Sequence, residues 1–202
     1  MGTKSKISAS GRDLPEERVL IERCQDIQIR AETYLQMLEP QGTLAEFGLA
    51  GPLREVGLTH LTGARSALCQ ALMKANESSK ADFLDAAHRD IDAAINNLRL
   101  SAEIEDVVGA MLTRAWLPSL ESDADGAWAD LDEAWDIAER GPMRLHMADI
   151  HLYRARLFFR EETYPWKSPQ DDLAAAEKLI NECGYHRRDE ELADAKRAIL
   201  GV

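Results

Sequence analysis

A short phrase that recurs along the chain constrains its fold more than any other feature of the sequence. The phrase is Asp-apolar-x-x-Ala, and it begins, at intervals of 40 and 42 residues, at Asp90, Asp130 and Asp172. In the second copy, Ala127, Leu131 and Ala134 are spaced so that they share one face of an α-helix. Alanine lets a neighbouring helix approach closely, and leucine fills the hole beside it. The phrase therefore predicts a helix-packing stripe that is used three times.

The segments that precede these stripes repeat as well. Residues 112–117 read LTRAWL and residues 152–157 read LYRARL, an offset of forty that places Arg114 and Arg154 at equivalent positions. A weaker copy of the arrangement occupies residues 54–100. A single helix hairpin cannot cover its own apolar face, so hairpins of this kind stack on one another. We therefore expect three helix hairpins in tandem, with a period near forty residues.

The rest of the chain shows helical spacing of apolar residues and no strand-like alternation. We expect an all-α fold: an α-solenoid of about three stacked hairpins with an N-terminal helix and a C-terminal capping helix. The predicted helices begin at Asp13 and then occupy residues 54–75, 80–100, 103–119, 125–140, 143–161, 169–183 and 188–200. The predicted domains are a disordered tail at 1–12, the N-terminal helix with an irregular connector at 13–52, and a repeat domain at 53–202.

Residues typical of helix ends indicate several of these boundaries. Ser79, Ser168 and Asp189 each suit an N-cap, where a side-chain oxygen accepts a hydrogen bond from a free backbone N–H. Gly141 and Gly184 follow predicted helices, at the position where a left-handed glycine is typical. We therefore expect those two glycines to terminate their helices in the left-handed conformation.

Composition and charge exclude several classes of partner. The formal net charge of −12 and the pI near 4.9 argue against a nucleic-acid-binding surface, which needs clustered Lys and Arg. No apolar run is long enough for a membrane span, and the polar start of the chain lacks the apolar core of a signal peptide. Cys24, Cys69 and Cys183 lack the C-x-x-C spacing of a zinc site. We therefore expect a cytoplasmic protein with no nucleic-acid or membrane partner.

The stripe from Ala127 to Ala134, which follows an Asp-Gly turn, resembles the second helix of a tetratricopeptide repeat. Residues 127–157 and 184–192 are similar to the C-terminal repeat region of large bacterial signalling proteins, many of which carry a NACHT-type or related STAND ATPase module upstream. The resemblance covers roughly residues 54–200 and implies a tetratricopeptide-like array that binds a protein or peptide. The chain has no G-x-x-x-x-G-K-[ST] loop, so the ATPase activity is not implied.

The recurrent charges allow two interpretations. Arg114 and Arg154 fall at equivalent positions, in step with the aspartates that open each stripe. In the first interpretation, each arginine pairs with an aspartate of its own or the next hairpin and fixes the stacking register. In the second, the arginines line a concave face and bind the carboxylates of a partner.

Aromatic residues are the other candidates for binding. Trp116, Trp128, Trp135 and Trp166 suit either an interface or the core. The segment 164–169, which contains two prolines, predicts a defined loop that either covers the hairpin as a hydrophobic lid or docks a partner. The residues that we predict to bind protein are Arg114, Trp116, Arg154, Arg156, Tyr164 and Trp166.

No grouping of nucleophile, base and orienting residue is visible in the sequence. His146 and His151 are five residues apart, which does not match the spacing of a helical zinc pair. We therefore expect no catalytic residues, no metal and no cofactor. The predicted function is a non-catalytic protein–protein interaction or scaffold module, and the alternative is the sensor or regulatory arm of a STAND-type ATPase signalling system. An enzyme of unrecognised type is the remote third hypothesis, and the oligomeric state is left open.

Overall fold

The computed structural model describes residues 15–38, 50–73, 77–121 and 123–201. Across these ranges the chain is helical and contains no strand, which confirms the all-α prediction. The helices are α1 (Pro15–Leu38), α2 (Ala50–Met73), α3 (Glu77–Leu100), α4 (Ile104–Arg114), α5 (Trp116–Leu120), α6 (Ala124–Arg140), α7 (Arg144–Phe158), α8 (Pro169–Cys183) and α9 (Asp189–Leu200). A 3-10 turn, His186–Arg188, precedes α9. The tail at 1–12 and the connector at 39–49 lie outside the described residues.

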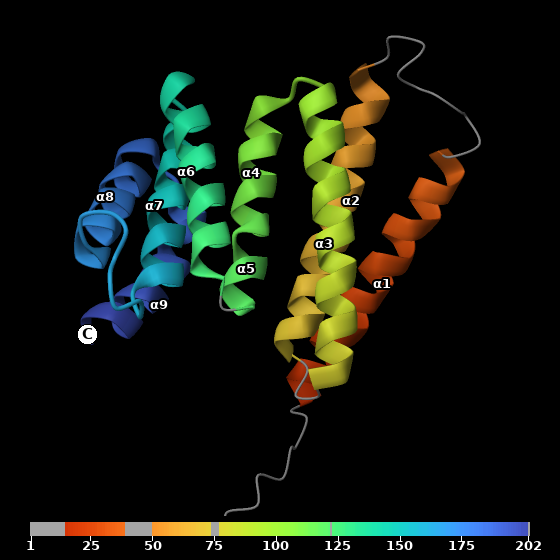
Figure 1. Cartoon of the computed structure of the whole chain (residues 1–202), viewed down its shortest axis with the longest axis horizontal. Coiled ribbons are helices and arrows are strands. Elements are labelled where there is room, and N and C mark those ends of the chain that lie inside the picture. The colour runs from red at the N-terminus through yellow and green to blue at the C-terminus, as the bar shows by residue number, and fades with distance from the viewer. Residues whose placement is uncertain (1–14, 39–49, 74–76, 122, 202) are drawn as a thin grey trace, which may run out of the picture.

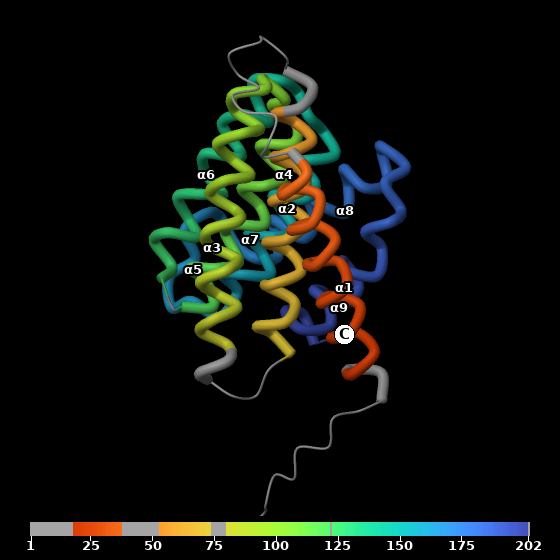
Figure 2. Tube along the Cα trace, turned by 90° about the vertical axis from the view of Figure 1, so that its right-hand side faces the viewer, coloured from red at the N-terminus to blue at the C-terminus, as the bar shows by residue number. Residues whose placement is uncertain are grey.

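The helices pack side by side in a row that runs from α1 to α8 and α9 (Figure 1). Helices α2 and α3 form the first hairpin, α4 and α6 the second, and α7 and α8 the third, with α5 as a short turn between α4 and α6. Viewed along the row, α2, α4 and α7 lie in the middle, with α3 and α6 on one side and α1, α8 and α9 on the other (Figure 2). The middle helices contact one another in chain order, so they present a shared surface.

The recurrent alanine stripe lies in the core, where the sequence pattern places it. Ala127, Leu131 and Ala134 of α6 are each at most 1% exposed. Their equivalents in α3, Ala87, Ile91 and Ala94, are buried to the same degree. Leucine and alanine at helical spacing thus pack the second helix of each hairpin against its neighbours.

Proline breaks the helix that the sequence predicted at residues 103–119. Helix α4 ends at Arg114, and α5 begins at Trp116. Pro118 has no N–H to donate to the carbonyl of Arg114, four residues earlier, and its ring crowds that carbonyl. The break is therefore located one turn before the proline. It allows Trp116 to lie half-buried at the end of α4.

Two of the predicted helix ends are confirmed. Ser168 Oγ accepts a hydrogen bond from the backbone N–H of Asp171 at 3.0 Å, as an N-cap does, and Pro169 occupies the first position of α8. Gly184 ends α8 with φ of 65°, in the left-handed region. These ends are set by residues within one turn of the boundary, which is why the sequence identifies them.

Other predicted ends are wrong. Gly141 does follow α6, but its φ of −99° is not left-handed. Ser79 lies within the first turn of α3, and Asp189 is the first residue of α9, so neither precedes its helix. Helix α2 begins at Ala50, although Pro52 predicted irregular structure there. Proline is accommodated in a first turn because the N–H groups there have no partner within the helix.

Candidate protein-binding face

Arg114 and Asp130 form a buried ion pair inside the second hairpin. Nε and Nη2 of Arg114 donate to Asp130 Oδ1 at 2.9 and 2.6 Å, and Asp130 is only 7% exposed. Burial opposes the charge of Arg114, but the hydrogen bond and the charge of Asp130 raise its pKa. Arg114 Nη1 also lies 3.6 Å from a carboxylate oxygen of Asp92, in the preceding hairpin. This geometry agrees with the packing interpretation of the recurrent charges.

The equivalent aspartates in the other two hairpins have different partners. Asp90 of α3 accepts a hydrogen bond from Nδ1 of His60 at 2.9 Å. Gly63 takes the position of Arg114 there, and a Cβ at Gly63 would come within 2.8 Å of Asp90 Oδ2. Asp172 of α8 accepts from Nδ1 of His151 at 2.6 Å. Each recurrent aspartate therefore binds its own first helix, through a histidine at the same repeat position in the first and third hairpins and through Arg114 in the second.

Arg154 lies at the position of Arg114 but is stacked between two indoles. Its guanidinium carbon is 4.8 Å from the ring centre of Trp135 and 4.4 Å from that of Trp166. Nη2 of Arg154 donates to Asp132 Oδ1 at 3.2 Å, and the same oxygen accepts from Trp166 Nε1 at 3.0 Å. Arg154 is 6% exposed, and burial lowers its pKa. The side chain thus holds the third hairpin to the second and does not face a partner.

Tyr164 and Trp166 turn inward from the loop between α7 and α8. The Tyr164 hydroxyl donates to Asp172, and the Trp166 ring meets Phe158 edge-on at 5.2 Å. Burial, followed by the hydrogen bond to Asp172, raises the pKa of Tyr164 above its usual value. These contacts favour the lid interpretation of the loop over the docking interpretation. Of the predicted binding residues, Arg114, Arg154, Tyr164 and Trp166 are thus engaged in packing.

Trp116 and Arg156, the other two predicted residues, lie together on a different surface. The Trp116 ring meets Tyr153 edge-on, with centroids 6.1 Å apart, and the Arg156 guanidinium carbon is 5.2 Å from the centre of the Trp116 ring. Arg156 Nη1 is 3.7 Å from Glu191 of α9. The surface therefore combines the start of α5, the C-terminal part of α7 and the first turn of α9.

A buried aspartate orders the arginines that precede α9. Asp149 of α7 accepts hydrogen bonds from Nε and Nη2 of Arg188, at 2.7 and 3.1 Å, and from the Tyr185 hydroxyl at 3.0 Å. Arg187 Nη2 donates to that same hydroxyl at 2.6 Å. Burial opposes the charge of Arg188, but the hydrogen bond to Asp149 and the charge of Asp149 raise the pKa of Arg188. The 3-10 turn is thereby fixed against α7, with Arg187 on its exposed side.

Arg65 approaches the same surface from α2. Its Nε donates to Thr113 Oγ1 at 3.1 Å, and its Nη2 to the carbonyl of Gly109 at 3.4 Å, both on α4. The residue is exposed to solvent, yet desolvation lowers its pKa, and the positive charges of Arg188 and Arg187 lower it further. Tyr153 and Asp149 act in the opposite direction, so the side chain lies near residues of α7 as well as near the two arginines that precede α9.

We name the surface formed by Arg65, Trp116, Tyr153, Arg156, Arg187 and Arg188 the arginine face. Arg156 and Arg188 both have Glu191 within 4 Å, as ion-pair partner. Over the described ranges of the chain, Arg65 and Arg187 have no carboxylate within that distance, and they bond only to neutral oxygens. The arginine face therefore offers two oriented guanidinium groups whose charge is not neutralised by direct contact.

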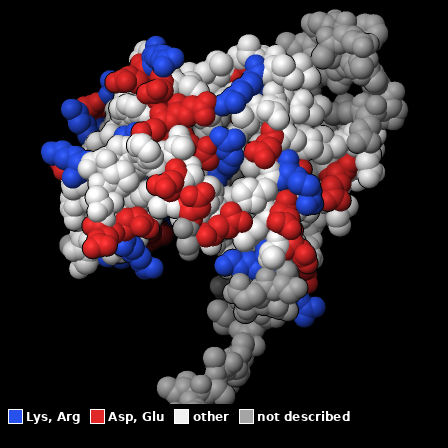
Figure 3. All heavy atoms as spheres, in the orientation of Figure 1, with Lys and Arg blue, Asp and Glu red and all other residues white. Residues whose placement is uncertain are grey.

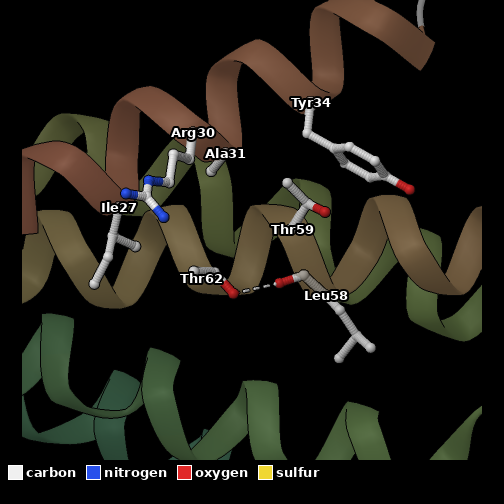
Figure 4. A pocket seen from close by; sticks show the side chains of 7 residues that line it. All are labelled: Ile27, Arg30, Ala31, Tyr34, Leu58, Thr59 and Thr62. Carbon is white, nitrogen blue, oxygen red and sulfur yellow. Dashed lines mark hydrogen bonds between the residues drawn. The ribbon is translucent and has the colours of Figure 1, made fainter.

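An apolar pocket lies between α1 and α2. It has a volume of about 330 Å³ and is lined by Ile27 and Tyr34 of α1 and by Leu58 and Thr62 of α2, among others. Figure 4 shows Ile27 and Tyr34 extending from α1 over α2. Leu58, Thr62 and Arg65 follow at four- and three-residue steps, so they share one side of α2. Arg65 thus lies on the same side of α2 as two of the residues that line the α1–α2 pocket.

The alignment of the repeats contains a signal for Arg65, although the repeated phrases themselves do not include this residue. The offsets that align the repeated leucines also align Arg65, Trp116 and Arg156, one from each first helix. Tyr153, Arg187 and Arg188 lack such a signal, because their proximity depends on how α9 folds back on α7. The predicted set therefore contained two residues of the arginine face and lacked the other four.

Comparisons with protein-family models, with curated proteins and with solved structures find no match to this chain. Among the described helices, none has the length and apolar character that crossing a membrane requires. The same ranges hold no cluster of three or more His, Cys, Asp or Glu side chains suited to a metal ion. The function is therefore inferred from the geometry of the arginine face.

Proposed function

We propose that the chain is a non-catalytic protein-interaction module, an α-solenoid of three tetratricopeptide-like hairpins whose arginine face binds an extended segment of a partner. One or two carboxylates of that segment would bind Arg65 and Arg187. An apolar side chain beside them would occupy the α1–α2 pocket. Aromatic and arginine side chains concentrate binding energy at interfaces, and both are present on this face.

The contacts between consecutive hairpins support the solenoid. Each second helix contacts the first helix that follows it, and the first helices contact one another in order. Ion pairs join the hairpins at each step: Arg114 with Asp92 at 3.6 Å, and Arg154 with Asp132 at 3.2 Å. The aspartates are equivalent residues of successive second helices, so the junction repeats as it does in solenoids.

The observation that carries the binding proposal is the unneutralised charge of Arg65 and Arg187. The hydrogen bonds of Arg65 to α4 fix its orientation in advance, which lowers the entropic cost of binding. The face that carries α3 and α6 is rich in acidic residues (Figure 3), and the chain as a whole carries a net charge of −12. A long acidic tract would be repelled by this background. We therefore expect a segment in which single carboxylates alternate with apolar residues.

Site-specific photocrosslinking in the native host tests this proposal. The photoreactive residue p-benzoylphenylalanine at position 156, on the arginine face, should crosslink a discrete partner peptide, whereas the same residue at position 140, on the far end of α6, should not. Arg65→Glu should reduce the crosslink at least tenfold, because it places a carboxylate against the partner's own. Arg140→Glu is the matched control, since it makes the same change of charge at an exposed site.

Absence of a crosslink at position 156 would contradict binding at the arginine face, and a crosslink that survives Arg65→Glu would show that Arg65 does not bind the partner. The sequence of the crosslinked peptide also separates the two hypotheses on the partner. Peptides from a STAND-type ATPase would identify the chain as an arm of such a signalling system, and peptides from other proteins would support a scaffold.

A further inference from the structure

A second hollow lies on the opposite side of α7 from the arginine face. It consists of two adjoining pockets of about 380 and 210 Å³ that share Ala124, Phe158 and Glu161 as lining residues. Phe158 is five residues after Tyr153, half a helical turn away from it around α7. We name this hollow the Trp128 groove, after the aromatic residue that lines its larger pocket. None of the residues of the arginine face lines it.

Apolar side chains form part of the floor of the Trp128 groove. Phe158 is 3% exposed and is held in place by its edge-on contact with Trp166. Ala124 and Ala127 of α6 complete the floor, and small side chains there leave the space open. The turn that brings α6 against α5 is tight, since a Cβ at Gly126 would meet Pro118 Cβ at 3.2 Å. An incoming side chain therefore finds the space already shaped.

The rim of the groove combines an exposed aromatic ring with negative charge. Trp128 is 43% exposed, next to Ala127 of the packing stripe but turned away from the core. Asp125 and Glu161 line the same pocket, are both exposed, and have no cationic partner in the parts of the chain that the structure describes. A tryptophan face attracts a cation, and neighbouring carboxylates strengthen that attraction.

We infer that the Trp128 groove docks a partner segment in which a lysine or arginine is next to an apolar side chain. The cation lies over Trp128 between Asp125 and Glu161, and the apolar side chain occupies the floor beside Phe158. The charge of the rim excludes the acidic segment proposed for the arginine face. The module therefore has two binding surfaces of opposite charge preference, on opposite sides of α7.

Selection from a displayed library of random dodecapeptides tests this inference with the full chain as bait. Wild type should enrich peptides with Lys or Arg beside Leu, Ile, Phe or Met. Trp128→Ala should reduce that enrichment at least tenfold, and Arg65→Glu should leave it unchanged. The double variant Asp125→Lys/Glu161→Lys should abolish it too, and because both residues are exposed it also serves if Trp128→Ala does not fold. Circular dichroism verifies the fold of each bait.

The inference is overturned if no basic-apolar motif is enriched, or if the motif survives both Trp128→Ala and the double lysine variant. The same selection reads the arginine face independently. An acidic-apolar motif that is lost with Arg65→Glu and kept with Trp128→Ala reports on that face alone. Failure of one proposal is thus distinguishable from failure of the other.

Discussion

Arg154 and Arg65 show how one residue type is used in two regions of this array. Arg154 lies in the seam between the second and third hairpins, 6% exposed, with an indole on each side and Asp132 at its end. Arg65 lies on the arginine face, exposed, and bonded only to a hydroxyl and a carbonyl of α4. The first arrangement joins hairpins. The second leaves a full charge available.

The charges that surround the two arginines also differ. Burial lowers the pKa of both arginines, but nearby Asp172 and Asp132 offset this at Arg154. At Arg65, Tyr153 and Asp149 oppose the desolvation, whereas the two arginines that precede α9 add to it. A carboxylate that arrives from a partner relieves both effects at once. The comparison teaches that the two arginines differ in their direct contacts, because Arg154 meets a carboxylate and Arg65 meets only neutral oxygens.

Truncation of the two arginines should give the largest contrast. Arg154→Ala removes the filling between Trp135 and Trp166 and should destabilise the protein by about 2–4 kcal/mol. Arg65→Ala, at an exposed site, should change the free energy of unfolding by less than about 0.5 kcal/mol. Urea denaturation followed by circular dichroism measures both. Equal effects of the two substitutions would contradict the distinction.

The ion pair inside the second hairpin, between Arg114 and Asp130, can be probed by exchange of charge. Asp130→Ala leaves Arg114 buried without its main partner and should cost about 2–3 kcal/mol of stability. The double variant Asp130→Arg/Arg114→Asp restores an ion pair of reversed polarity and should recover part of that loss. Recovery is incomplete because Asp92 then faces a carboxylate. A double variant no more stable than Asp130→Ala would show that the contact does not stabilise the hairpin.

Two helical glycines extend the comparison to the backbone. Gly63 lies inside the first hairpin, where an added Cβ would meet Asp90 Oδ2 at 2.8 Å. Gly63→Ala should therefore displace that carboxylate from His60 and lower the free energy of unfolding by about 1–2 kcal/mol. A Cβ at Gly109, on the arginine face, meets only Arg65 Nη2, at 4.0 Å. Gly109→Ala should stabilise the chain by about 0.5–1 kcal/mol through helix propensity. Thermal denaturation of the two variants measures the difference, and destabilisation by both would remove it.

The smallest expected effect concerns Cys69, one turn beyond Arg65 on α2. Its thiol is exposed, yet desolvation, with a contribution from Cys24, raises its pKa. A raised pKa means less thiolate at a given pH, so alkylation by iodoacetamide at pH 8 should be slower than that of glutathione and should still accelerate up to pH 9.5. Mass spectrometry of the labelled site measures the rate. A rate equal to that of glutathione would show that desolvation does not raise the pKa of Cys69.

Local features of this fold were predictable, and features that depend on distant contacts were not. Ser168 and Gly184 end their helices through hydrogen bonds within one turn, and the Ala127–Leu131–Ala134 stripe follows from helical spacing alone. The break at Ala115 was missed because the helical pattern of α4 continues past it, although Pro118 was its cause. Sequence pattern thus identifies which residues are buried more readily than where a helix bends.

The candidate site shows the same limit. Arg114 and Arg154 were paired by the repeat, but only the structure reveals that the second is stacked by Trp166, twelve residues beyond it. The arginine face brings Arg65 near Arg188, more than a hundred residues away, and no period in the sequence encodes that approach. Repeat position therefore predicts packing roles well and binding roles only where they happen to recur.

The contacts of Arg154 with the second hairpin have a consequence for the order of the hairpins. Removal of the second hairpin would bring Arg154 to Asp92, the equivalent of its own Asp132, so the ion pair would survive. The residue at the position of Trp135 would then be Ile95, and the guanidinium would lose one of its two aromatic neighbours. The hairpins are consequently not interchangeable units. A chain built in this way resists lengthening or shortening by duplication and deletion, because each joint fits only the neighbours that it already has.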